Sequence, residues 1–368
     1  MSLRIVLVCA ACFTFFLVNS QTDDGRETNT SIKNVKNGIY MVEGNGGNVA
    51  FSTGVDGILM IDAQYAEGAE ALLKDIRRVS DEPIKFLVNT HAHIDHTGAN
   101  ALIAAEGATI VSHIGVREAF FEKRRGSDKG DAIEMAAFPT VTFEDKMSFH
   151  MNEDTILVFH VDNAHTDGDA VVYFAQSNVI HAGDLFFNGK YPYIDAKGGG
   201  SVKGYIDGLE KILMLCDNET KIIPGHGKLG TKANLNASKN MLANLYRKVT
   251  YNYLLGKTEA EILAMRDFTS PYDTKGYGSG FISTKKILKT IYDEVSKEQS
   301  DFDPRSMEKR LKELKKQNQN RSENEAQKSP SKRHVPTEAE KDDEPKEKEP
   351  AKETKQENGT EGKNGSGL

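Results

Sequence analysis

The feature that most constrains this chain is a cluster of polar side chains directly after an apolar segment. Residues 84–89 (IKFLVN) have the composition of a buried strand, and residues 91–96 (HAHIDH) follow at once. Four side chains that can ligate a metal ion thus lie within six residues, in a chain with ten histidines. The segment predicts a metal site at the end of a strand, and a histidine-rich surface loop is the competing interpretation.

The spacing within this cluster predicts how its side chains divide. Residues two apart on an extended segment project to the same side, so His91 and His93 can bind one ion. Asp95 and His96 lie at the turn into a short helix expected from Thr97 to Ala105, where they can face a second ion. Imidazole and carboxylate without thiolate suit Zn²⁺, with iron or manganese as alternatives.

Three later residues extend the set of potential ligands, and each also follows a predicted strand. They are His165, Asp184 and His226. Each is a weak signal alone, because a lone histidine after a strand is more often a hydrogen-bonded surface or core residue. Together with the first cluster, they place every candidate ligand where the loops at a sheet edge converge.

The predicted elements follow the same plan in both halves of the chain. Strands are expected at 38–43, 48–52, 57–62, 84–89 and 109–112, and later at 140–143, 147–151, 155–161, 170–174, 178–181 and 221–223. Helices are expected at 67–79, 97–105, 116–123, 202–216, 232–255 and 287–295. Strands and then helices, twice over, predict an α/β fold with helices outside two β-sheets.

The two ends of the chain differ in composition from the part between them. Residues 1–20 combine one basic residue, an apolar run and small residues before Gln21, the order of a secretory signal peptide. A membrane anchor is the alternative, although the run is shorter than the ~20 residues that span a bilayer. Residues 301–368 are nearly half charged and contain one aromatic residue, so they cannot bury enough apolar surface to fold.

We therefore expect four segments and an exported protein, secreted or periplasmic. They are a signal peptide at 1–20, a flexible segment at 21–34, one domain at 35–298 and a disordered charged tail at 299–368. The net charge of −7 argues against a nucleic-acid partner, because phosphate contacts need a basic face. Cys216 alone among three cysteines lies outside the signal peptide, and its apolar setting predicts a buried, unreactive thiol.

The motifs and their order resemble the metallo-β-lactamase superfamily. They are His-x-His-x-Asp-His, a single His, Gly-Asp and Pro-Gly-His-Gly, and the likeness covers about residues 35–295. The resemblance implies an αββα sandwich of two mixed β-sheets flanked by helices, with a two-metal site at one sheet edge. It assigns His91, His93 and His165 to one ion, assigns Asp95, His96 and His226 to the other, and places Asp184 between them.

The implied activity is that of an exported binuclear zinc hydrolase with a small-molecule substrate. Two ions about 3.5–4 Å apart share a water and lower its pKa, so that a hydroxide can attack an acyl carbon. Asp95 is the expected catalytic residue, because it can both ligate a metal ion and orient the hydroxide. A β-lactam-like amide, a thioester or a lactone is the expected substrate, and two Zn²⁺ ions per chain are the expected cofactor.

Departures from the family pattern keep the substrate open. Asp184 stands where many zinc β-lactamases carry Cys, which is similar to glyoxalase II, lactonases and phosphodiesterases. The Lys that binds a β-lactam carboxylate is not found after Asp184, and Lys190 or Lys228 could substitute for it. A one-iron oxygenase similar to persulfide dioxygenases, and a non-catalytic zinc-binding protein whose tail is the interaction module, are the rival hypotheses.

Weaker predictions concern residues around the site. Candidate substrate contacts are Asn188, Tyr191, Tyr193 and Lys228. Asp62 ends a strand and could hold a ligand histidine by a hydrogen bond, although an ordinary turn carboxylate fits equally well.

Overall fold

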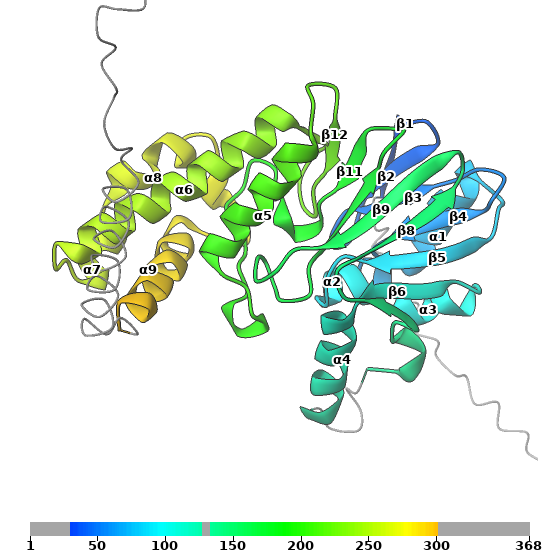
Figure 1. The fold of residues 1–368 in the computed structure, drawn as a ribbon, viewed down its shortest axis with the longest axis horizontal. Coiled ribbons are helices and arrows are strands. Elements are labelled where there is room, and N and C mark those ends of the chain that lie inside the picture. Colours follow the sequence, from blue (N-terminus) through cyan, green and yellow to red (C-terminus); the bar gives the residue numbers. More distant parts are fainter. Residues whose placement is uncertain (1–29, 127–132, 301–368) are drawn as a thin grey trace, which may run out of the picture. The chain divides into compact units, whose positions relative to one another are not determined.

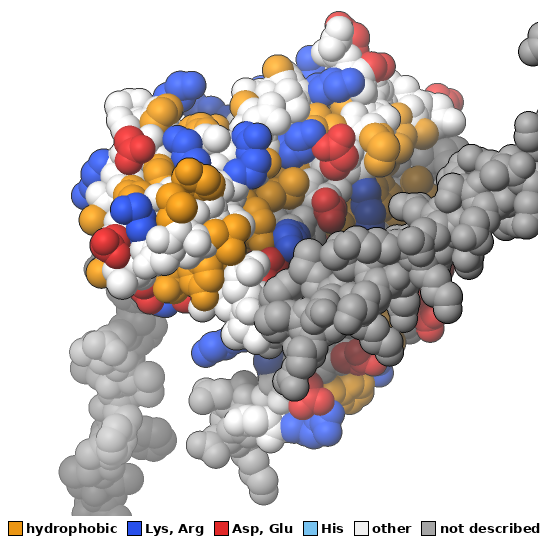
Figure 2. Space-filling model, turned by 60° about the vertical axis from the view of Figure 1, so that its left-hand side comes forward, with side chains coloured by type: hydrophobic (Ala, Val, Ile, Leu, Met, Phe, Trp, Pro, Cys, Tyr) orange, Lys and Arg blue, Asp and Glu red, His pale blue; other side chains and the backbone are white. Residues whose placement is uncertain are grey.

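The computed structural model describes residues 30–126 and 133–300. The predicted signal peptide, residues 21–29 of the predicted flexible segment and residues 301–368 of the predicted tail lie outside the described residues. Within the described ranges, no helix is long and apolar enough to cross a membrane. Figure 2 shows one face of the molecule, on which basic, acidic and apolar side chains are interspersed.

The N-terminal half of the chain forms a mixed sheet of seven strands in sequential order. They are β1 (Ser31–Lys36), β2 (Ile39–Glu43), β3 (Val49–Ser52), β4 (Ile58–Ile61), β5 (Ile84–Asn89), β6 (Thr109–His113) and β7 (Val141–Phe143). The first four strands pair antiparallel, and β4 to β7 pair parallel. The parallel pairs need crossovers, which carry α1 (Ala69–Val79), α2 (Ile94–Thr97), α3 (Asn100–Ala105) and α4 (Ile114–Gly126).

The second sheet has six strands in the order β13-β12-β11-β10-β9-β8. They are β8 (Lys146–Met151), β9 (Asp154–His160), β10 (Ala170–Phe174), β11 (Val179–His181), β12 (Lys221–Ile223) and β13 (Gly230–Thr231). Only β11 and β12 pair parallel, and α5 (Val202–Leu215) forms their crossover. The helices α6 (Lys232–Leu254), α7 (Glu259–Leu263), α8 (Arg266–Asp273) and α9 (Thr284–Ser300) follow (Figure 1).

Three apolar layers hold these elements together. Leu59 and Ile61 of β4 face the second sheet, where they join Val158 and Val172 in a core between the two sheets. Their neighbours Ile58 and Met60 face the helices instead, because successive strand residues point to opposite faces. A third core lies between the second sheet and the helices α5, α6 and α9. The αββα arrangement of two mixed sheets flanked by helices is therefore confirmed.

The structure corrects the predicted boundaries at several places. Residues 31–34 were expected to be flexible, but they belong to β1, an edge strand whose mostly polar sequence gives no apolar alternation. The helix expected from Thr97 begins at Ile94 as α2, so Asp95 and His96 are helical. The expected tail boundary at 299 is wrong by two residues, since α9 continues to Ser300. The short elements α7, α8 and β13 were not predicted.

Candidate metal centre

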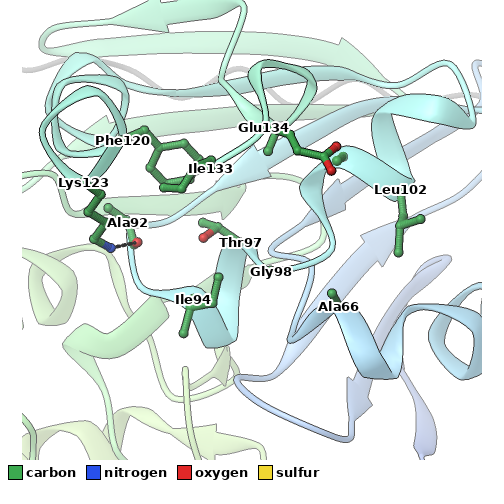
Figure 3. A pocket seen from close by; sticks show the side chains of 12 residues that line it. Ala66, Ala92, Ile94, Thr97, Gly98, Leu102, Phe120, Lys123, Ile133 and Glu134 are labelled. Atoms are coloured by element: carbon green, nitrogen blue, oxygen red, sulfur yellow. Dashed lines mark hydrogen bonds between the residues drawn. The ribbon is translucent and has the colours of Figure 1, made fainter. Parts of the chain in front are cut away.

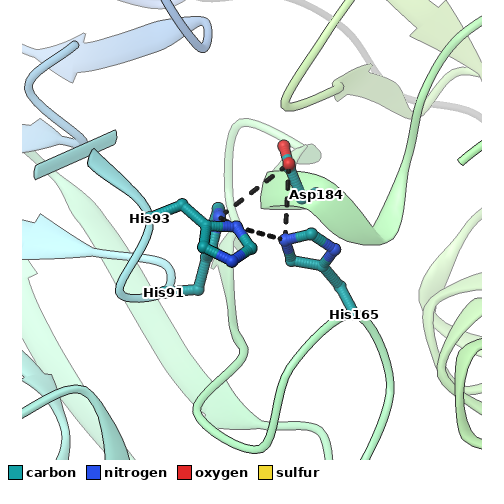
Figure 4. Close-up of side chains that lie close together, drawn as sticks. All are labelled: His91, His93, His165 and Asp184. Carbon is teal, nitrogen blue, oxygen red and sulfur yellow. Dashed lines mark hydrogen bonds and ion pairs between the residues drawn. The ribbon is translucent and has the colours of Figure 1, made fainter. Parts of the chain in front are cut away.

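The seven predicted ligands come together in two adjoining groups. The first group contains His91, His93, His165 and Asp184, and the second contains Asp95, His96 and His226. The segment after β5 supplies four of them, and the loops after β9, β11 and β12 supply one each. Figure 4 shows the first group, in which histidines from two separate loops point toward the carboxylate of Asp184.

Three ring nitrogens face one another in the first group. Nδ1 of His93 lies 3.1 Å from Nε2 of His91 and 2.9 Å from Nε2 of His165. Oδ2 of Asp184 lies 3.5 Å from Nε2 of His165 and 3.8 Å from Nε2 of His91. The first group therefore offers three nitrogens and one oxygen, which is a donor set typical of zinc sites.

The second group is arranged around the ring of His226. Its Nε2 atom lies 3.2 Å from Oδ2 of Asp95 and 3.4 Å from Nε2 of His96. Oδ1 of Asp184 lies 3.1 Å from Nε2 of His96 and 3.4 Å from Nε2 of His226. The two oxygens of the Asp184 carboxylate therefore face different groups, which is the arrangement expected of a ligand shared by two ions.

The surroundings of Asp184 also suit a ligand. Its Oδ1 atom is buried and, among the described residues, has no hydrogen bond of acceptable geometry although His96 is near. The backbone at position 225 approaches so closely that a Cβ atom there would lie 2.0 Å from this oxygen, which explains the need for Gly225. A buried carboxylate oxygen without a good hydrogen bond is costly unless a cation binds it.

Each ligand histidine has an inner ring nitrogen, which faces the other ligands, and an outer ring nitrogen, which points away from them. In three of these histidines the outer nitrogen is held by a hydrogen-bond acceptor. Nε2 of His93 lies 3.0 Å from Oδ2 of Asp195, and Nδ1 of His165 lies 2.8 Å from the carbonyl oxygen of Tyr193. Nδ1 of His96 lies 2.7 Å from Oδ2 of Asp62. Because carboxylates and carbonyls only accept, the outer nitrogens carry the protons.

His91 completes this pattern through a hydroxyl group. Its Nδ1 atom lies 3.0 Å from Oγ1 of Thr90, which itself donates to Oδ2 of Asp62 at 2.8 Å. The Thr90 oxygen is then free to accept a hydrogen bond from His91. When the rings of His91, His93 and His165 are neutral, their inner nitrogens are therefore unprotonated. The lone pairs of these three nitrogens then face one another.

This lone-pair arrangement is the test of whether a metal ion fits. Tetrahedral zinc with bonds of about 2.0–2.1 Å separates its nitrogen ligands by about 3.3 Å. The separations of 2.9 Å and 3.1 Å around His93 are close to that value. Three lone pairs so near one another repel, and a bound cation removes that repulsion. The residues of the first group therefore fit Zn²⁺.

Burial and charge give the two groups different protonation states. Burial lowers the pKa of His91 well below its usual value and that of His165 to about 4. In the second group burial also acts to lower the pKa, but the carboxylate of Asp184 together with Asp62 beside His96 and Asp95 beside His226 outweighs it. The pKa of His96 is raised well above its usual value, and that of His226 is raised to about 9. Without metal, protons therefore occupy the second group near neutral pH.

The structure also shows supporting residues that the sequence did not reveal. Oδ2 of Asp169 accepts hydrogen bonds from the backbone nitrogens of His165 at 2.6 Å and Thr166 at 2.9 Å, which fixes the loop carrying His165. The side chain of Asn48 donates to the carbonyls of Pro224 and Gly227, on either side of His226. Asp169 follows His165 by four residues, a spacing that could have suggested the contact. No sequence signal marks Asp195, which lies far along the chain from His93.

The weaker predictions have mixed outcomes. Asp62 makes the predicted hydrogen-bond contact with a candidate ligand histidine, His96. The ring of Tyr193 lies 5.7 Å from the rings of both His93 and His165, so it borders the centre. Tyr191 is buried in the core with its hydroxyl donating to Asp273, which does not suit a substrate contact.

The two remaining candidate substrate contacts, and the one cysteine of the described residues, have simpler placements. The amide of Asn188 donates to the backbone carbonyl of Lys228, and the Lys228 side chain is exposed. Cys216 is buried as predicted.

The fold and the two ligand groups define a metal-binding α/β protein of two packed sheets. The sequence profile of the metallo-beta-lactamase superfamily matches residues 39–226, just over half of the chain. The chain therefore belongs to the metallo-beta-lactamase superfamily, whose members are generally hydrolases.

Curated relatives are similar at low identity. The type 2 metallo-beta-lactamases of Bacillus sp. (strain 170) and Bacillus cereus are 21% and 19% identical over 177 residues. These alignments cover 48% of this chain and 65% of each relative, so the chain spans less than two thirds of the relatives' length.

Solved structures confirm the fold. A metallo-beta-lactamase from Pontibacter korlensis gives a TM-score of 0.51 at 18% identity, covering 59% of this chain and 100% of the other. The sec-alkylsulfatase Pisa1 from Pseudomonas sp. gives 0.56 at 18% identity, covering 72% of this chain and 50% of the other. At these identities the likeness concerns the fold alone.

Proposed function

We propose that this protein is an exported hydrolase that binds two zinc ions and cleaves an acyl bond. The observation that carries the proposal is the Asp184 carboxylate, whose two oxygens face two separate groups of ligands. His91, His93 and His165 would hold one ion, Asp95, His96 and His226 the other, and Asp184 would contact both. Such ions supply Lewis acid catalysis and lower the pKa of a shared water toward neutrality.

The protein's own residues position and charge this centre. The hydrogen bonds from His93, His96 and His165 to their outer partners fix each ring and hold its inner nitrogen ready to bind. Burial acts to raise the pKa of Asp95, but the hydrogen bond from His226 and the charge of His96 keep it below its usual value. Asp95 is therefore ionised at neutral pH and can accept a hydrogen bond from the attacking water.

The exposed side of the centre admits a small substrate. The side chains of His226, His93 and Asp95 are 31%, 21% and 20% exposed, whereas those of His91, His96 and His165 are almost fully buried. A substrate therefore approaches across His93, Asp95 and His226. The complete second group supports this hydrolase over the one-iron oxygenase, which needs a single metal ion.

The substrate class is tested on zinc-loaded protein with and without a chelator. A chromogenic cephalosporin, a thioester and a lactone represent the three acyl classes, and a secondary alkyl sulfate is added because of the likeness to Pisa1. Chelator-sensitive turnover of an acyl substrate at about 1–10³ s⁻¹ supports the proposal. The proposal is contradicted if only the sulfate is turned over. It is also contradicted if protein containing two zinc ions turns over none of these substrates.

The role of the ligands is tested separately from the substrate. His93→Ala should abolish turnover and lower the zinc content, because His93 lies at the centre of the first group. His150→Ala is the matched control, since His150 is exposed on β8 and belongs to neither group. Unchanged turnover of His93→Ala would exclude the proposed mechanism.

A further inference from the structure

A pocket lies beside the segment that carries the first ligands. Its volume is about 520 Å³, and residues of α2, α3 and α4 line it together with residues just before the short helix at Met135–Ala137. Figure 3 shows the side chains of Ile94, Phe120 and Leu102 around this space. Its volume lies within the roughly 300–1,000 Å³ typical of small-molecule sites.

The lining is mostly apolar and includes large side chains left in contact with solvent. Ile94 is 57% exposed and Leu102 is 47% exposed, although both are aliphatic. Phe120, Ile133 and Ala137 form the floor with other members of a small apolar cluster. Covering this exposed aliphatic surface with an apolar group is favourable, because it removes apolar area from water.

Two observations connect this pocket to the metal centre. Ala92, Ile94 and Thr97 line the pocket and belong to the same short segment as the ligands His91, His93 and Asp95, so the pocket adjoins the ligand segment. Nζ of Lys123, also in the lining, donates to the backbone carbonyl of Ala92 at 2.8 Å (Figure 3). The pKa of Lys123 is lowered by burial, while the charges of Asp195 and Asp95 at the centre act in the opposite direction.

We propose that this pocket binds the apolar chain of the substrate, while the acyl group lies at the metal centre. The inference rests on the proposed hydrolase function and adds the substrate class, an acyl compound with a linear aliphatic chain. Ile94 links the two parts, because it follows the ligand His93 and contributes its exposed side chain to the pocket. A chain leaving the centre across His93 and Ile94 enters the pocket toward Leu102.

The test measures binding rather than turnover, so it does not depend on hydrolysis. Acetate, butanoate, hexanoate and octanoate are titrated calorimetrically into the zinc-loaded protein and into the protein with a chelator. Burial of each methylene should increase affinity about threefold to fourfold, or roughly tenfold for each step in the series, until the pocket is full. The dependence on chain length should remain with chelator, because apolar burial does not need the metal ions.

Two variants locate the binding site. Leu102→Glu places a charge in the pocket, and Ala66→Phe fills it from the exposed residue Ala66. Each variant should reduce the gain in affinity for each step of the series from roughly tenfold to about twofold or less. Leu254→Glu is the matched control, because Leu254 is 64% exposed on α6 and does not line the pocket. Circular dichroism establishes that each variant is folded.

The outcomes separate this inference from the proposed function. Affinity independent of chain length in the parent protein, or an equal gain in the parent and both pocket variants, overturns the inference. The inference is supported if affinity rises with chain length in the parent protein and in Leu254→Glu but not in the two pocket variants. If no acyl substrate is hydrolysed while this pattern holds, the proposed function and the acyl substrate class fail, and only the binding of an aliphatic chain in this pocket stands.

Discussion

Oδ2 of Asp62 lies 2.7 Å from Nδ1 of His96, and both side chains are completely buried. The same carboxylate accepts hydrogen bonds from the backbone nitrogen and the hydroxyl of Thr90, which in turn contacts His91. One carboxylate at the end of β4 therefore orients a ligand histidine in each group. Its position depends on the parallel pairing of β4 with β5, which places Asp62 beside the segment that carries the ligands.

Replacing this carboxylate tests its role directly. Asp62→Asn should keep the fold, because asparagine tolerates the positive φ of 62° at this position. It loses the charge and one acceptor, so zinc affinity at the second group should fall about 10- to 100-fold. Zinc affinity is measured by competition with a chromogenic chelator. Asp81→Asn, at an exposed turn, is the control, and equal affinities for the two variants would contradict the prediction.

Under the proposed function, zinc binding at the two groups should depend differently on pH. Without metal, His96 and His226 have raised pKa values, about 9 for His226, so zinc must displace their protons at neutral pH. Zinc affinity at the second group should then rise with pH, by up to tenfold per unit for each proton displaced, and the contribution of His226 should level off above about pH 9. His91 and His165 have lowered pKa values, so these two ligands should contribute little to the pH dependence of zinc affinity at the first group between pH 6 and pH 8.

The measurement is a two-step zinc titration of metal-free protein at pH 6, 7 and 8. The same two histidines should also make the metal-free fold depend on pH. A raised pKa in the folded state stabilises the protein below the unfolded value of about 6.5. That contribution is lost as pH rises toward about 9 for His226. Equal pH dependence for both zinc ions would contradict the assignment of protons to the second group.

Asp169 should matter for stability more than its place outside the ligand set suggests. Asp169→Ala leaves the buried backbone nitrogens of His165 and Thr166 without their acceptor. The free energy of unfolding of the metal-free protein should fall by about 2–4 kcal/mol, as measured by urea denaturation. Asp167→Ala removes an exposed carboxylate from the same loop and should cost about 0.5 kcal/mol. A smaller loss for Asp169→Ala than for this control would refute the role given to Asp169.

Cys216 should be chemically silent in the folded protein. Burial raises the pKa of its thiol to about 11, and its Sγ atom contacts the carbonyl of Ile212. In protein that begins at Gln21, iodoacetamide at pH 7.5 should therefore label Cys216 only after denaturant is added. The extent of labelling is measured by mass spectrometry before and after unfolding. Rapid labelling under native conditions would show that the thiol is accessible.

The sequence by itself determined which side chains gather in the two groups of the candidate site. The ligands His91, His93, Asp95 and His96 lie so close together that local spacing predicts their grouping. Each remaining candidate ligand lies in the loop just after a strand, and strand ends converge at one edge of a folded sheet. The internal strands were also predictable, because buried apolar runs such as Ile84–Asn89 differ sharply from their flanking residues.

Only the tertiary structure decided which distant residues orient these ligands. Asp195 reaches His93 across 102 positions, and Asn48 reaches the loop of His226 across 176 positions to Pro224. Single polar residues at such separations leave no periodic or local pattern. The pocket beside Ile94 also depends on packing, because Ala66 and the segment around Ile133 meet residues of α2, α3 and α4 there. Local composition specifies a ligand, whereas its partners and the space beside it follow from the packing of the two sheets and their helices.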